Sequence, residues 1–180
     1  MQNEVQFAGF GGQGIMLIGK ILAHAAMKEG YEVSWVPSYG PEMRGGTAHC
    51  TVIISEDEIG SPVVTRPQVA MVMNLPSLDK YEPLIKPGGL LVVNSSLVDR
   101  DAERTDIDVV SVPANDIAEE MGEKRLANMV LLGALLEKLP ILPANEVAEA
   151  LGRHIPEHRR NLLDANLKAM KRGAAVAKGN

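Results

Sequence analysis

Residues 9–14, with the sequence GFGGQG, have the glycine spacing that lets backbone N–H groups approach a phosphate closely. An apolar run precedes them and a helical pattern follows, so we expect a turn between a strand and a helix. The N–H groups and the dipole at a helix N-terminus attract anions. The candidate binding residues are Gly9, Gly11, Gly12, Gln13 and Gly14. The alternative is a tight turn that serves only to pack the helix on the sheet.

A second polar stretch, SYGPEMRGG at residues 38–46, follows the second expected strand. Its candidate binding residues are Ser38, Tyr39, Glu42 and Arg44, and a guanidinium suits a carboxylate or phosphate. Ligands of open α/β sheets gather at the carboxyl edge, where both stretches are expected. We expect the first two strands of a doubly wound sheet to be neighbours, so Arg44 and the N–H groups of residues 11–14 could converge on one anion. The alternative is a surface loop with an internal Glu42–Arg44 contact.

Other chemistries fit the sequence less well. Dinucleotide binding needs an acidic residue at the end of the second strand, but that strand ends Trp35-Val36-Pro37-Ser38. His49 and Cys50 are adjacent in an expected strand, so their side chains point to opposite faces and form no nucleophile–base pair. Cys50 is the only cysteine, which excludes internal disulfides and cysteine-held iron–sulfur clusters within this chain. We expect no metal site.

The elements that position these loops alternate between strands and helices. Strands are expected at residues 4–8, 31–36, 47–55, 69–74, 90–94 and 108–112. Helices are expected at residues 15–29, 77–85, 114–121, 126–139, 144–151 and 157–176. This order predicts a doubly wound, mainly parallel α/β sheet with helices on both faces, Rossmann-like, and a helical C-terminal third. The third strand is expected to make an antiparallel or edge hairpin-like excursion, because a loop rather than a helix precedes it. Residues 1–176 form one domain, and 177–180 a flexible tail.

Composition bounds the class of protein. The 180 residues are 46% hydrophobic and carry a net charge of −5, as in an ordinary globular domain. The acidity and the 3% aromatic content argue against nucleic-acid binding. No apolar run reaches transmembrane length, and no signal peptide is apparent, so we expect a cytoplasmic protein without a membrane partner.

The two glycine-rich stretches together resemble the gamma subunit of 2-oxoacid:ferredoxin (or acceptor) oxidoreductases. Residues 74–77 (NLPS), 86–90 (KPGGL) and 128–134 (NMVLLGA) fit the same family, so the resemblance covers nearly the whole chain. Within the family, the chain is most similar to the gamma subunit of the 2-oxoglutarate enzyme, followed by those of the branched-chain 2-oxoacid and pyruvate enzymes.

The resemblance implies a coenzyme A-acylating oxidative decarboxylation carried out by a complex. Thiamine diphosphate, Mg²⁺ and iron–sulfur clusters would lie on alpha and beta subunits and, in complexes that have one, a ferredoxin-like delta subunit, with coenzyme A as co-substrate. This chain, with no thiamine motif and one cysteine, would be a non-catalytic gamma subunit that binds no cofactor firmly and could form a homodimer when isolated. A free-standing nucleotide- or dinucleotide-binding protein, or a structural dimerisation module, is the alternative.

Overall fold

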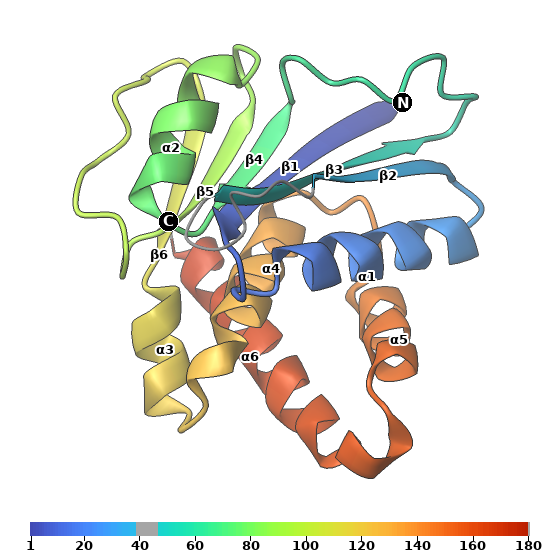
Figure 1. Ribbon diagram of the computed structural model, residues 1–180, viewed down its shortest axis with the longest axis vertical. Coiled ribbons are helices and arrows are strands. Elements are labelled where there is room, and N and C mark those ends of the chain that lie inside the picture. The colour runs from blue at the N-terminus through green and yellow to red at the C-terminus, as the bar shows by residue number, and fades with distance from the viewer. Residues whose placement is uncertain (39–46, 180) are drawn as a thin grey trace.

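The chain folds around one six-stranded sheet in the order β2-β3-β1-β4-β5-β6 (Figure 1). The computed structural model describes residues 1–38 and 47–179. The strands are β1 (Gln2–Phe10), β2 (Glu32–Ser38), β3 (Thr47–Ser55), β4 (Val69–Val72), β5 (Leu90–Asn94) and β6 (Asp108–Val112). The α-helices are α1 (Ile15–Lys28), α2 (Leu75–Tyr81), α3 (Ala114–Glu120), α4 (Ala127–Lys138), α5 (Ala144–His154) and α6 (Asn161–Lys178). Short 3-10 helices are η2 (Glu82–Leu84), η3 (Lys124–Leu126) and η4 (Glu157–Arg159).

The pairing is parallel from β1 through β4 and β5 to β6, and antiparallel where β3 meets β1 and β2. β3 is antiparallel to β1 and β2, as expected, because the eight residues between β2 and β3 are fewer than a parallel crossover connection needs. The expectation that β1 and β2 are neighbours is wrong, since β3 lies between them. The position of β3 between β1 and β2 results from pairing between segments distant in sequence, which no local sequence pattern indicates.

Helices cover both faces of the sheet, as a doubly wound fold requires. One face packs against α1, α4, α5 and α6, with Phe7 of β1 and Val52 of β3 fully buried against them. The other face of β4 and β5 packs against α2, and Leu78 and Tyr81 of α2 belong to the same buried apolar cluster as Val72 of β4. The central strands β4 and β5 are buried at every residue and almost continuously apolar, because both of their faces are covered.

The C-terminal third is helical, as expected, and α4 crosses α6 at very close range. A Cβ atom built on Gly133 of α4 would lie 2.0 Å from the Met170 carbonyl oxygen of α6. One built on Gly173 would lie 1.7 Å from the Val130 carbonyl oxygen. Helix α6 continues to Lys178 and buries Ala177, so the chain is helical where a tail was expected to begin.

Among the described residues, no helix combines the length and the apolar character needed to cross a bilayer.

Candidate functional site

The turn between β1 and α1 is closed by the side chain of Gln13. Its Oε1 accepts a hydrogen bond from the Phe10 N–H at 2.6 Å, and the Gln13 N–H donates to the Phe10 carbonyl oxygen at 3.2 Å. Gly12 and Gly14 have φ of +93° and +78°, conformations that favour glycine. A Cβ on Gly9 would lie 2.6 Å from Gln13 Oε1. The glycines therefore make a tight turn, and Gln13 braces it from inside.

The N-terminus of α1 is left open by this turn. Gly14 is the N-cap residue, and no side chain of the described residues accepts a hydrogen bond from the first turn. The first intrahelical donor is the Ile18 N–H, which donates to the Gly14 carbonyl oxygen at 3.2 Å. The N–H groups of Ile15, Met16 and Leu17 have no acceptor in the part of the chain that the structure describes. These donors and the helix dipole favour an anion at this point.

Two buried asparagines organise the neighbouring strand ends. Asn74, which follows β4, accepts a hydrogen bond from the Ser77 N–H at 2.9 Å, and so caps α2. Its Nδ2 donates to Gln13 Oε1 at 3.4 Å, which ties this cap to the glycine turn. Asn94, at the end of β5, donates to the Met73 carbonyl oxygen at 3.3 Å. Both side chains have bonded partners, so we assign them a structural role at the carboxyl edge.

A third buried asparagine, Asn128 of α4, lies directly against the glycine turn. Its Nδ2 is 2.2 Å from the position that a Cβ on Gly14 would take. The residue is 5% exposed. Asn128 also lines a pocket of about 250 Å³ with Leu17, Arg125 and Met129. Sequence reasoning included this asparagine in a family-like stretch but assigned it no role, because nothing local places it beside residue 14.

Ser38 ends β2 at the same edge of the sheet as the glycine turn. It pairs with His49 of β3, which pairs in turn with Ala8 of β1. Because β3 is antiparallel to both neighbours, β1 and β2 run in the same direction and their carboxyl ends share one edge. Tyr39, Glu42 and Arg44 lie outside the described residues, so the convergence of Arg44 with the turn stays a prediction.

Cys50 and His49 point to opposite faces of β3, as expected. Burial raises the pKa of the Cys50 thiol to about 12, and its Sγ lies 3.6 Å from the Ile15 carbonyl oxygen under α1. The His49 ring lies on the other face, 5.8 Å from the ring of Tyr81. Cys50 is therefore a core residue and not a nucleophile. In the described ranges, no three His, Cys, Asp or Glu side chains gather in a way that could hold a metal ion.

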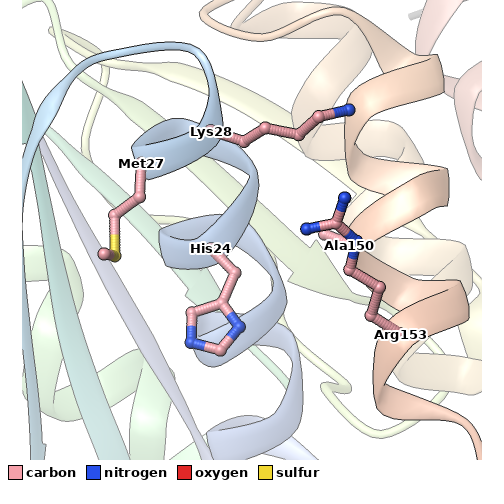
Figure 2. Close-up of a pocket in the computed structure, with 5 residues that line it drawn as sticks. All are labelled: His24, Met27, Lys28, Ala150 and Arg153. Carbon is pink, nitrogen blue, oxygen red and sulfur yellow. The ribbon is translucent and has the colours of Figure 1, made fainter.

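A second hollow, of about 350 Å³, lies between α1 and α5 (Figure 2). His24 and Lys28 of α1 face Arg153 of α5 across it. Lys28 forms ion pairs with Glu146 and Glu149, and Arg153 donates to Glu149 at 2.7 Å. Because carboxylates neutralise both cations, we interpret this hollow as a helix–helix contact.

The comparisons with known proteins identify the family. The model of the family described as "Pyruvate ferredoxin/flavodoxin oxidoreductase" matches residues 4–176. The chain belongs to this family. It is 38% identical over 178 residues to ketoisovalerate oxidoreductase subunit VorA of Methanothermobacter marburgensis, covering 98% of this chain but 37% of VorA. The chain thus spans little more than a third of that relative. It is 36% identical to 2-oxoglutarate synthase subunit KorC of Methanocaldococcus jannaschii, covering 99% of this chain and 95% of KorC.

Solved structures of family members share the fold. The gamma subunit of a keto/oxoacid ferredoxin oxidoreductase from Geobacter sulfurreducens superimposes with a TM-score of 0.85 at 29% identity, covering 99% of both chains. A chain of 2-oxoglutarate:ferredoxin oxidoreductase from Magnetococcus marinus, solved with 2-oxoglutarate, coenzyme A and succinyl-CoA, gives a TM-score of 0.90 at 29% identity. That match covers 99% of this chain and 31% of the Magnetococcus chain. The chain therefore has the size and fold of a separate gamma subunit of this family, which longer relatives contain as one part of a larger chain.

Proposed function

We propose that this chain is the gamma subunit of a 2-oxoacid:ferredoxin oxidoreductase complex. The observation that carries the proposal is the end-to-end match to the Geobacter gamma subunit, in which neither chain has a large unmatched part. The chain's single cysteine is buried in the core, so iron–sulfur clusters would have to lie on companion chains. Those alpha and beta chains, with a possible ferredoxin-like delta chain, would also carry thiamine diphosphate and Mg²⁺. The isolated subunit would be inactive, and could associate with itself in their absence.

The substrate we propose is 2-oxoglutarate, with a low-potential acceptor such as ferredoxin taking the electrons. KorC and the Magnetococcus enzyme support this choice by their names, whereas VorA supports a branched-chain 2-oxoacid. The residues that distinguish the two acids would lie on the companion chains. Comparing 2-oxoglutarate with 2-oxoisovalerate as substrates of the assembled enzyme therefore tests this part by itself.

The role we propose for the carboxyl edge is to contact coenzyme A. The glycine turn, with its open helix N-terminus, is suited to an anionic group, and coenzyme A is anionic. Ser38 begins the second loop at the same edge. With Arg44 added from that loop, the site would combine rigid backbone donors with a charge-assisted hydrogen bond.

Co-purification tests the proposal. The tagged chain would be co-expressed with the candidate alpha and beta chains encoded beside its gene, and the isolated complex would be weighed by native mass spectrometry. We expect a stable complex that contains the tagged chain and bound thiamine diphosphate. Failure of the chain to associate with thiamine-binding chains would contradict the proposal. Within the intact complex, Arg44→Ala should raise the KM for coenzyme A. If KM and kcat were both unchanged, residues 38–46 would serve only in packing.

A further inference from the structure

Strand β2 leaves one side of the sheet open. It is the first strand in the sheet order, so among the described residues it pairs with another strand only on its β3 side. None of its seven residues is fully buried. At the opposite edge of the sheet, by contrast, Val110 and Val112 of β6 are buried. The backbone N–H and C=O groups along the free side of an edge strand are able to bond another strand.

The sequence of β2 has few of the features that keep edge strands from pairing with other chains. Charged side chains, prolines and bulges are the usual means of protection. The pairing of β2 with β3 runs through all seven residues without a bulge. Glu32 and Pro37 lie near the two ends, and the four residues between them, VSWV, are uncharged. The middle of β2 is therefore open to pairing.

The side chains of this middle part expose apolar surface on both faces of the sheet. Val36 pairs with Thr51 on the face away from α1, and it is 44% exposed. Trp35 lies on the other face, where α1 runs beneath β2 (Figure 1). A Cβ built on Gly19 of α1 would lie 3.2 Å from Trp35 Nε1, yet the indole is still partly exposed. A strand added to β2 would cover apolar surface from both residues.

A second copy of the chain fits this edge in an antiparallel, two-fold arrangement. Side chains alternate between the two faces, so residues that lie opposite each other must belong to the same face. The register that pairs all seven residues places Trp35 opposite its own counterpart and Ser34 opposite Val36. Glu32, the only charged residue of β2, then lies opposite Ser38, so like charges do not meet.

We propose that the free side of β2 binds a second copy of this chain through antiparallel β2–β2 pairing, which joins the two six-stranded sheets into one. Closed two-fold symmetry is the commonest arrangement of homo-oligomers, and it requires a surface complementary to itself. β2 meets this requirement in length, in strand direction and in charge. Seven residues span only about 23 Å, so we expect a dissociation constant in the range of about 1–100 μM. The proposal supplies a surface for the self-association of the isolated chain and does not require the companion chains.

Sedimentation velocity of the full chain, from about 1 to 500 μM, tests the proposal. Val36→Lys places a cation on each side of the two-fold axis, so dimerisation should weaken about tenfold or more. Val109→Lys is the matched control, because Val109 is a 37% exposed valine of β6, the other edge strand. We expect its dissociation constant to stay within about twofold of the parent chain. Circular dichroism verifies that both variants fold.

Amide hydrogen exchange locates the interface without any substitution, and so keeps the test valid if Val36→Lys does not fold. In the parent chain, N–H groups of residues 32–38 should exchange more slowly at high concentration than at low concentration. Trp35 is the only tryptophan of the chain, so its fluorescence emission should shift to shorter wavelength over the same concentration range.

Three results would overturn the proposal. They are a parent chain that stays monomeric at about 500 μM, equal dimerisation of Val36→Lys and the parent chain, and a dimer in which residues 32–38 gain no protection. Protection of these residues only in the complex with companion chains would mean that a companion strand, and not a second copy, occupies the edge. Co-purification with thiamine-binding chains is measured separately, so the gamma-subunit assignment stands or falls independently of these results.

Discussion

Replacing Gly133 or Gly173 by alanine tests how closely α4 and α6 pack. The added Cβ would lie 2.0 Å from a carbonyl oxygen in the first case and 1.7 Å in the second. Raising these distances to an ordinary contact of 3.4 Å would move the helices apart by about 1.5 Å. The obstructing atoms are backbone, so no side-chain rotation relieves the overlap.

The expected cost follows from that separation. A helix shift of this size removes dispersion contacts along the whole crossing, and overpacking of this kind costs about 2–4 kcal/mol in the free energy of unfolding. The better helix propensity of alanine offsets about 1 kcal/mol. For a chain of this length, we therefore expect Tm to fall by roughly 3–10 °C in each variant. The urea midpoint should fall at an unchanged m value.

Gly152→Ala is the matched control for this prediction. Gly152 lies in α5, and a Cβ added there would have a Leu163 side-chain carbon as its nearest neighbour at 3.6 Å, an ordinary contact. That variant should be neutral or more stable by up to about 1 kcal/mol. The double variant of Gly133 and Gly173 should cost less than the sum of the single variants, because one separation relieves both overlaps. If all three single variants were equally stable, the close crossing would be refuted.

Three further predictions concern the turn, the thiol and pH. Gly14→Ala should destabilise the chain by about 1–3 kcal/mol more than Gly30→Ala in urea unfolding. Both glycines have positive φ, but only at Gly14 would the added Cβ meet another side chain, that of Asn128. Burial raises the pKa of the Cys50 thiol to about 12, so a thiol reagent at pH 8 should react with it only after unfolding. Burial, with His154 and Lys20 nearby, lowers the pKa of His24, so the unfolded chain binds that proton more tightly. The stability that His24 contributes should thus be present above about pH 6.5 and be lost as pH falls through its lower folded pKa. His24→Gln should flatten that dependence in unfolding curves, and an unchanged pH profile would contradict the assignment.

Local pattern was enough to predict most of the elements. The strands expected at residues 47–55, 90–94 and 108–112 have the same bounds in the structure. Their β-branched and apolar runs, ended by turn residues, carry the signal over a few positions. The antiparallel direction of β3 also followed from the sequence, because no crossover helix precedes it. Its place between β1 and β2 did not, since strand order depends on pairing between distant segments.

Some parts of the candidate site could be predicted from the sequence and others could not. The glycine turn is visible from its composition, and Gly12 and Gly14 have the positive φ that glycine allows. Gln13 was named as a candidate binding residue, and no local pattern predicts that its side chain braces the turn by accepting a hydrogen bond from the Phe10 N–H. Asn128 lies beside the turn because α4 packs against the sheet. The spacing of apolar residues in the sequence predicts an apolar α4 but not this neighbour. A contact of one polar side chain across the fold leaves no local pattern.

Reconstituted activity is the most direct test of the gamma-subunit assignment. Companion alpha and beta chains from the same organism would be assayed for reduction of a viologen dye with 2-oxoglutarate and coenzyme A, with and without this chain. We expect coenzyme A-dependent reduction that requires this chain and saturates when this chain is stoichiometric with the thiamine-bearing chains. The same rate without this chain, or no association with those chains at saturating concentration, would contradict the gamma-subunit assignment.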